Sequence, residues 1–289
     1  MADVGLNARF EGVFQWDRRR LDFRGRTLVM GILNVTPDSF SDGGRYFDAD
    51  RAIAHGLRLA KEGADAIDVG GQSTRPGSEP VGVEAELERV LPVISELASK
   101  LTLPISIDTT EAKVAEAALD AGAAMINDIS ALRFDESMAD LVAERRVPVV
   151  LMHMQGTPAD MQTDPRYEDV IGEVKVFLRE RIAFATGRGI DRERIIVDVG
   201  IGFGKRLEHN LTLLARISEF CELGLPVLVG HSRKRFLGEF LGLEADQRDH
   251  ATLAVSTHLA GKGVHMLRVH DVGPTRKAVE LIHRLRSIS

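Results

Sequence analysis

Eight short apolar segments recur along the chain, and a stretch long enough to form a helix separates each from the next. They are Leu28–Leu33, Ala66–Val69, Pro104–Ile107, Ala123–Ile126, Val147–Met152, Arg194–Val197, Pro226–Val229 and His265–Leu267. Short runs of β-branched and aliphatic residues at this spacing are typical of parallel strands that alternate with helices. Eight such units close naturally into a barrel. The sequence therefore predicts an α/β protein with a single (β/α)8 TIM barrel.

Residues outside these segments complete the prediction. Residues 10–27 contain two short extended stretches with a basic turn between them, so we expect a β-hairpin that closes the bottom of the barrel and buries Trp16 or Leu21. The barrel then occupies residues 28–289, and residues 1–289 form one domain. Glycines at 63 and 122 are expected to end two helices. The predicted helices cover Ala49–Glu62, Glu111–Asp120, Asp169–Thr186, Asp249–Ala260 and Arg276–Arg286.

The composition fits such a protein and narrows its setting. A length of 289 residues suits one barrel, whose usual size is roughly 250 residues. The net charge of −6 gives no overall attraction to nucleic acid or to an anionic membrane. The single cysteine, Cys221, excludes an internal disulfide and suits a reducing compartment. Residues 1–10 lack the features of a signal peptide, and no apolar stretch reaches the roughly 20 residues that span a membrane, so we expect a cytoplasmic protein.

Nearly every apolar segment ends at a polar residue with a chemical use. Because the carboxyl ends of barrel strands meet on one face, we expect these side chains to line a single pocket. They are Asn34, Asp108, Asn127, Asp198, His231, Arg268 and His270. His153 also ends a segment, but we expect it to be structural or peripheral, since no second His or carboxylate lies at a metal-ligand spacing from it. Two long loops open on the same face. The first, residues 34–44, is either a lid or a turn-rich connection with no role, and the second, residues 70–78, offers groups that suit an oxyanion or a phosphate.

Several segments resemble the signature segments of bacterial dihydropteroate synthases. The matching segments include Asn34-Val-Thr-Pro-Asp-Ser-Phe-Ser-Asp-Gly-Gly44, Gly71-Gln-Ser-Thr-Arg-Pro-Gly77, Leu151-Met-His-Met-Gln-Gly156, Gly202-Phe-Gly-Lys205 and Ser232-Arg-Lys234. The resemblance implies a TIM-barrel transferase of folate biosynthesis. Such an enzyme joins a dihydropterin that carries a CH2-pyrophosphate group to p-aminobenzoate, and it releases 7,8-dihydropteroate and pyrophosphate.

The strand-end residues suit the ring of a pterin. Its amino-pyrimidine edge offers adjacent N–H donors, which a buried carboxylate such as Asp198 accepts. Asn127 can bond ring nitrogens, and Lys234 donates to the ring carbonyl. Asp108 either faces the ring as a second carboxylate or caps the helix that follows. Met154 and Phe203 form apolar wall or plain core. The candidate substrate-binding residues are Thr74, Asp108, Asn127, Met154, Asp198, Phe203, Lys205, Lys234, Arg235, Arg268 and His270.

Other residues suit the pyrophosphate and the reaction. Arg268 and His270 follow the last segment, where barrels commonly bind phosphate, and the amide oxygen of Asn34 suits Mg2+, which prefers oxygen ligands. Conjugation of the CH2 cation with the ring favours an SN1-like path. The resemblance also implies a homodimer and a target of sulfonamides. The catalytic residues that it implies are Asp42, Phe40, Thr74, Arg75 and Lys234, with Asp38 as the alternative loop carboxylate.

Three positions depart from the family pattern. Gln72 stands where Glu is usual, Val199 where Pro is usual and Arg235 where Ser is usual. Arg235 either pairs with the carboxylate of p-aminobenzoate or opens a helix and points into water.

Two other functions are compared with the synthase activity. A pterin-dependent methyltransferase would not need the Ser-Thr-Arg loop or the anion site at Arg268 and His270, and a pterin-binding paralogue without activity would lose the chemistry of the loops.

Overall fold

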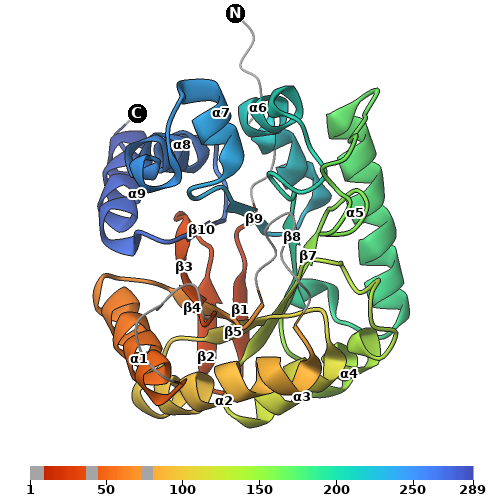
Figure 1. The fold of residues 1–289 in the computed structure, drawn as a ribbon. Coiled ribbons are helices and arrows are strands. Elements are labelled where there is room, and N and C mark those ends of the chain that lie inside the picture. The colour runs from red at the N-terminus through yellow and green to blue at the C-terminus, as the bar shows by residue number, and fades with distance from the viewer. Residues whose placement is uncertain (1–9, 37–44, 73–80, 289) are drawn as a thin grey trace, which may run out of the picture.

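The eight apolar segments form the strands of a closed parallel barrel. The computed structural model describes residues 10–36, 45–72 and 81–288. Over these ranges the barrel strands neighbour one another in the order β10-β3-β4-β5-β6-β7-β8-β9 (Figure 1). Every neighbouring pair is parallel, so the predicted (β/α)8 TIM barrel is confirmed. The strands are β3 (Leu28–Asn34), β4 (Ala66–Gly70), β5 (Ile105–Asp108), β6 (Met125–Asp128), β7 (Val149–Met152), β8 (Ile195–Asp198), β9 (Val227–Gly230) and β10 (Met266–Val269).

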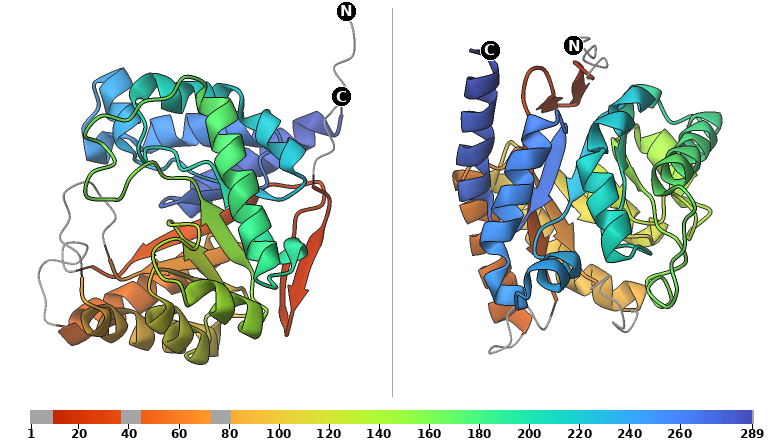
Figure 2. Two further views of the ribbon diagram at one scale, coloured as in Figure 1. Left: turned by 90° about the vertical axis from the view of Figure 1, so that its right-hand side faces the viewer. Right: turned by 90° about the horizontal axis from the view of Figure 1, so that it is seen from above.

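Helices surround the barrel on its outer side (Figure 2). They are α1 (Arg45–Lys61), α2 (Val83–Lys100), α3 (Ala112–Asp120), α4 (Met138–Arg145), α5 (Val170–Gly187), α6 (Leu207–Ala215), α7 (Arg235–Leu241), α8 (Asp249–Gly261) and α9 (Val272–Arg286). The five predicted helices are all present. The last begins at Val272 instead of Arg276, because Asp271 already has the extended backbone of an N-cap residue.

Two glycines end helices as the sequence predicts. Gly63 follows α1 with a φ of 98°, and Gly122 follows α3 with a φ of 108°. Glycine adopts this left-handed region without the strain that a Cβ would bring, so both positions suit the residue after a helix C-cap. Among the helices of the described ranges, none is long and apolar enough to cross a bilayer.

An N-terminal hairpin closes the bottom of the barrel. Strands β1 (Val13–Trp16) and β2 (Arg19–Asp22) pair in antiparallel fashion. Trp16 and Leu21 are both buried, so the predicted hairpin is confirmed. The indole Nε1 of Trp16 donates a hydrogen bond of 2.8 Å to the carbonyl of Ala124. Because Ala124 directly precedes β6, this contact lies at the amino ends of the barrel strands.

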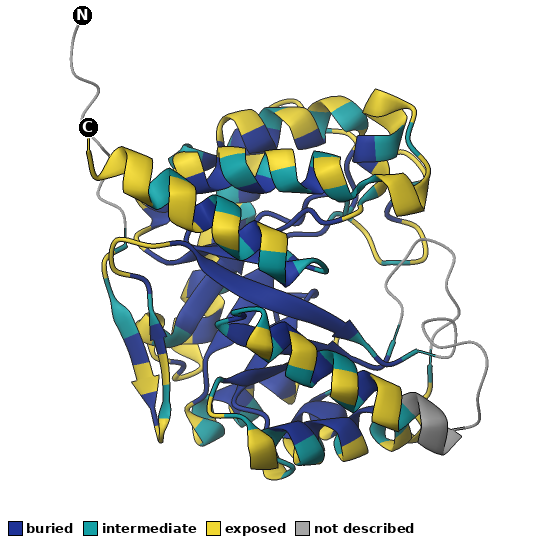
Figure 3. Ribbon diagram, turned by 90° about the vertical axis from the view of Figure 1, so that its left-hand side faces the viewer, coloured by how far each residue is buried: buried dark blue, intermediate teal, exposed yellow. Residues whose placement is uncertain are grey.

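The interior of the barrel changes from apolar to polar along its axis. Near the amino ends, inward side chains such as Met30, Met125 and Met266 share one core with the hairpin. Outward side chains such as Val29 and Ile67 belong to a larger core beneath the helices. Figure 3 shows the barrel strands buried and the outer helix faces exposed. The inward positions near the carboxyl ends are polar, and they form the candidate site.

Candidate functional site

Polar side chains form the upper layer of the barrel interior. In the strand register, Asn34 pairs with Gly70, Gly70 with Asp108, and Asp108 with Asn127, so these residues lie at one level. A Cβ on Gly70 would lie 3.5 Å from the Cβ of Asp108. Glycine therefore adds no bulk beside that carboxylate. On the other side of the barrel, Asp198 ends β8 at the same face.

One partly buried guanidinium joins two carboxylates of the barrel interior. Nε of Arg268 donates to Oδ2 of Asp68 at 2.6 Å, and Nη2 donates to Oδ2 of Asp108 at 2.7 Å. Nδ2 of Asn127 donates to the same Oδ2 of Asp68 at 2.9 Å. Burial acts to lower the pKa of Arg268, but the two carboxylates outweigh it and raise that pKa above its usual value. The guanidinium therefore stays charged inside the barrel.

Asp68 is a member of the site that sequence reasoning missed. It lies within the apolar segment Ala66–Val69, whereas the predicted site residues follow the ends of the segments. Its side chain is fully buried and faces the barrel interior beside Asn127 and Arg268. A lone carboxylate in a four-residue strand core is itself a signal, because buried charges are almost always paired.

The two strand-end carboxylates hold protons more tightly than free carboxyl groups do. Burial raises the pKa of Asp108 to about 7; Arg268 opposes the shift, and Asp68 and Glu86 add to it. Burial also raises the pKa of Asp198, and the Lys234 ammonium opposes that rise. A ligand that donates N–H groups to these oxygens would stabilise their charged forms.

Lys234 supplies the cationic donor on the opposite side. It is the N-cap residue of α7, its Nζ donates to the carbonyl of Ile201, and the same nitrogen lies 4.5 Å from the centre of the Phe203 ring. An ammonium over an aromatic face is attracted to it. Burial lowers the pKa of Lys234 to about 8, and Asp198 opposes this shift. Lys234 and Phe203 therefore lie together as the sequence predicts.

Lys205 has a different environment from the other candidate residues. Its Nζ lies 2.9 Å from Nδ1 of His153 and donates to the carbonyl of Phe203, also at 2.9 Å. Burial lowers the pKa of Lys205 well below its usual value. The side chain is only 3% exposed. Its amino group is therefore engaged by His153 and by the backbone carbonyl of Phe203.

Arg235 lies apart from the polar layer. It is the first residue of α7, and its side chain is 82% exposed, with Nε 3.9 Å from a carboxylate oxygen of Glu239. Of the two interpretations of this residue, the structure supports the one in which it opens a helix and points into water. The N-cap position of Lys234 explains this, because the helix begins there and turns the next side chain outward.

The remaining candidates occupy the rim and the wall. Nδ1 of His270 lies 2.9 Å from Oγ of Ser232, which also accepts the backbone N–H of His270. This contact ties the loop after β9 to the end of β10. Met154 is buried in an apolar cluster with Met152, against which Phe203 packs. The predicted wall residues thus lie together at one side of the layer.

Several predicted residues lie outside the described ranges. Of the positions that depart from the family pattern, Gln72 is half-buried and Val199 is fully buried. The residues outside the described ranges are Asp38, Phe40, Asp42, Thr74 and Arg75.

Asn34 is the candidate ligand for a cation. It ends β3 and is half-buried at the level of Asp108. In the described parts of the chain, no group of three or more His, Cys, Asp or Glu side chains is arranged to hold a metal ion. An ion here would take one amide oxygen from the chain and its other oxygens from phosphate and water. Mg2+ is commonly bound in this way, so the residue fits that ion.

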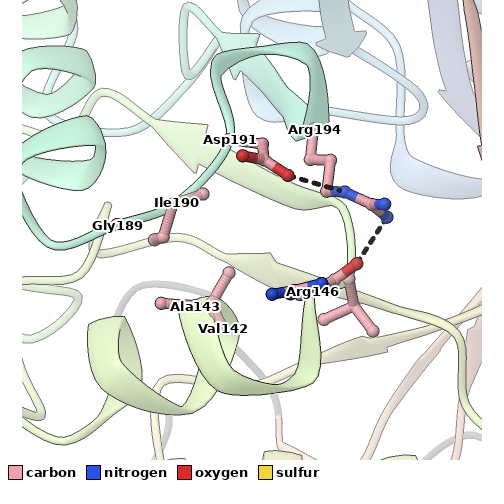
Figure 4. A pocket seen from close by; sticks show the side chains of 8 residues that line it. Val142, Ala143, Arg146, Gly189, Ile190, Asp191 and Arg194 are labelled. Atoms are coloured by element: carbon pink, nitrogen blue, oxygen red, sulfur yellow. Dashed lines mark hydrogen bonds and ion pairs between the residues drawn. The ribbon is translucent and has the colours of Figure 1, made fainter.

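A separate cavity of about 340 Å3 lies between the end of α4 and the start of β8 (Figure 4). Its wall includes Arg146, Asp191 and Arg194. Arg194 pairs with Asp191 at 3.4 Å and donates to the carbonyl of Arg146. These residues precede barrel strands, so the cavity is on the face opposite the polar layer. The contacts of Arg194 hold the segment before β8 against the segment before β7.

Comparisons with known proteins agree on one family. A family model described as pterin binding enzyme matches residues 30–270. Dihydropteroate synthase of Escherichia coli (strain K12) is 45% identical over 254 residues, which are 88% of this chain and 90% of that protein. The structure of Xanthomonas albilineans dihydropteroate synthase with 4-aminobenzoic acid is 50% identical, with a TM-score of 0.89 over 94% of this chain and 97% of that one. The Yersinia pestis enzyme with a sulfonamide drug complex is 41% identical, with a TM-score of 0.90 over 96% and 100%.

Glu86 is a buried carboxyl group behind the polar layer. It lies in the first turn of α2 against Gly71, where an added Cβ would meet the Cγ of Glu86 at 2.9 Å. Within the described ranges neither carboxyl oxygen makes a hydrogen bond of good geometry, and the nearby Thr109 side chain only partly opposes the effect of burial on the pKa of Glu86. Burial raises the pKa of Glu86 from its usual 4.5 to about 7. The folded protein therefore keeps this proton at a pH where the unfolded chain has lost it.

We expect Glu86→Gln to gain stability relative to the wild type as the pH rises. Between the unfolded and folded pKa values of Glu86, the wild type loses unfolding free energy with rising pH, because the unfolded chain releases a proton that the folded protein still holds. Glutamine carries no such charge. Urea unfolding of both proteins from pH 5 to pH 8 measures the difference in unfolding free energy. A difference that does not change with pH would show that Glu86 titrates normally.

Proposed function

Because the chain belongs to the dihydropteroate synthase family of pterin-binding enzymes, we propose that its strand-end layer is the site where a dihydropterin is joined to p-aminobenzoate. The enzyme is a transferase. It condenses (7,8-dihydropterin-6-yl)methyl diphosphate with p-aminobenzoate and forms 7,8-dihydropteroate and pyrophosphate. The function expected from the signature segments is confirmed by the relatives and by the structures that the fold matches.

The observation that best supports this site is the arrangement of two carboxylate acceptors and the Lys234 ammonium at the carboxyl ends of the strands. Asp108 and Asp198 present carboxylates at the barrel mouth, and Lys234 presents an ammonium beside Asp198. A pterin ring has N–H donors on its amino-pyrimidine edge and one carbonyl acceptor, so its hydrogen-bonding groups are complementary to this set. Phe203 and Met154 offer apolar surface to the ring faces.

The rim residues suit the leaving group. His270 is oriented by Ser232, and as a ring N–H donor it can bond a phosphate oxygen. Asn34 would hold Mg2+, which supplies neutralisation of the pyrophosphate charge when it is bound. Arg268 adds a fixed positive charge beside the ring. Together these groups favour departure of pyrophosphate.

The chemistry that follows is an SN1-like displacement. The bond between the CH2 carbon and the pyrophosphate oxygen breaks, and the cation left behind is conjugated with the pterin ring. The arylamine nitrogen then forms the new C–N bond and gives up one proton. An arylamine is unprotonated at neutral pH, so it needs position more than deprotonation. No covalent intermediate with the enzyme is required.

The residues of the two long loops complete the proposal. Asp42, or Asp38 in its place, stabilises the cation or takes the amine proton, and Phe40 forms wall beside it. Thr74 and Arg75 contact the pyrophosphate or the second substrate. Their support is the match of residues 34–44 and 71–77 to the family's segments. Lys205 acts from beneath the site by holding Phe203.

We further propose a cytoplasmic homodimer. Apolar side chains on the outside of two helices support a contact between copies, since Phe240, Leu241 and Leu281 are all more than half exposed in the single chain. The one cysteine, Cys221, is buried and suits a reducing compartment. Sulfonamides resemble p-aminobenzoate and would compete for its place.

Release of pyrophosphate tests the assignment against its two alternatives. We expect the purified chain with Mg2+ to release pyrophosphate and form dihydropteroate in equal amounts, and only when both substrates are present. A pterin-dependent methyltransferase or a binding paralogue would bind the pterin but release no pyrophosphate. A chain that binds a dihydropterin and yields no condensation product would contradict the proposed function.

Asp198→Asn tests the ring pocket. The substitution keeps the shape of the side chain but turns one acceptor into a donor that faces ring N–H groups. Buried donors left unpaired cost about 1–3 kcal/mol, so we expect the dihydropterin to bind at least about tenfold more weakly in calorimetry. Asp191→Asn, on the opposite face of the barrel, is the matched control and should bind normally. Equal affinity of Asp198→Asn and the wild type would remove Asp198 from the pocket.

A further inference from the structure

We infer that Asp68 is a positioning residue, which sets the direction of Asn127 and Arg268 so that the pocket presents acceptors to the ring N–H groups. The inference rests on the proposed pterin site and deepens it. Asp68 does not itself contact the ligand, because its side chain is fully buried within β4, one inward position below the mouth. Its effect reaches the ligand through the two side chains that bond it.

The orientation of Asn127 follows from the chemistry of a carboxylate. An ionised carboxylate accepts hydrogen bonds and donates none. Because Oδ2 of Asp68 lies 2.9 Å from the amide of Asn127, that amide must turn its nitrogen toward Asp68. The amide oxygen of Asn127 is then left as an acceptor for the ligand. Without Asp68, either end of the amide could face the pocket.

The orientation of Arg268 follows from two fixed points. Its Nε is held by Asp68 and its Nη2 by Asp108, at 2.6 and 2.7 Å. A planar guanidinium bound at two of its nitrogens has little rotational freedom. Asp68 also shares the cation with Asp108. Asp108 is therefore less neutralised than it would be if Arg268 paired with it alone. It can accept a hydrogen bond from a ligand more readily.

The arrangement is not one that stability alone would favour. Among the residues that the structure describes, Oδ1 of Asp68 has no hydrogen-bond partner, and neither has Oγ of Ser106, the register neighbour of Asp68 on β5. Unsatisfied buried polar groups are costly and rare, and in native proteins they call for an explanation. An amide at position 68 would carry a donor that can serve the Ser106 hydroxyl. Asp68→Asn is therefore expected to fold.

Asp68→Asn is the test. We expect the dissociation constant of a dihydropterin to rise at least about tenfold, because the acceptor that orients Asn127 and Arg268 loses its charge and holds them less firmly. The pH dependence of binding should change as well. The groups that act on Asp108 are Arg268 on β10, Asp68 on β4, Glu86 on α2, Asp128 on β6 and Lys234 at the start of α7.

Removal of the like charge of Asp68 should lower the pKa of Asp108, since Arg268 then serves one carboxylate instead of two. The pH midpoint of dihydropterin binding should therefore fall, by on the order of one unit. A residue that merely fills space would not move this midpoint. Weaker binding with an unmoved midpoint, or binding within twofold of the wild type, would overturn the inference.

Ser106→Ala is the matched control, because it removes the neighbouring unpartnered group at the same depth. Its affinity and midpoint should equal those of the wild type. If Asp68→Asn does not fold, NMR contacts of the Asn127 side-chain amide in the wild type decide instead, and an amide oxygen turned toward Asp68 would overturn the inference. A wild type that binds a dihydropterin but forms no product refutes the proposed function, whereas an active wild type matched by Asp68→Asn refutes only the role of Asp68.

Discussion

A single partly buried cation holds the polar layer together. Arg268 bonds Asp68 and Asp108 from the last strand of the barrel, and Asn127 joins the same network through Asp68. Removal of one partner from such a group leaves a charge uncompensated in a medium of low polarity, which is far more costly than the loss of a surface ion pair. The geometry of the pocket therefore depends on this cluster more than on any one contact to a ligand.

The rest of the barrel supports this charged cluster from below. The inward residues below it are apolar, and the hairpin seals the amino end through Trp16 and its bond to Ala124. Water is thereby excluded from below, and the charges are solvated by one another and by fixed backbone groups. Lys205 plays a similar part at one side, where it supports Phe203 through a backbone carbonyl. Recognition of one flat ring requires polar groups that are held in fixed positions, and the rigid apolar interior below the polar layer provides this.

Sequence reasoning recovered the strands and much of the mouth for a physical reason. Aliphatic runs at regular spacing define the strands, and barrel closure then brings strand-end residues such as Asp198 and Asn127 to one face. Asp68 was not predicted, because it lies within an apolar segment and not after one, among residues of the core. The contacts of Lys205 also escaped prediction, since spacing does not determine which neighbour a long side chain contacts. For Arg235 the sequence left two directions open, and the structure supports the one into water.

Proton release on binding is the most direct test of the claim that buried carboxylates recognise the ring. Calorimetric titration of the wild type with a dihydropterin, in buffers of different ionisation enthalpy at a pH just below 7, measures the protons exchanged on binding. Asp108 is partly protonated there, and the ring N–H groups favour its ionised form, which is the stronger acceptor. The account predicts a net release of protons. Binding without proton exchange, or with uptake of protons, would contradict it.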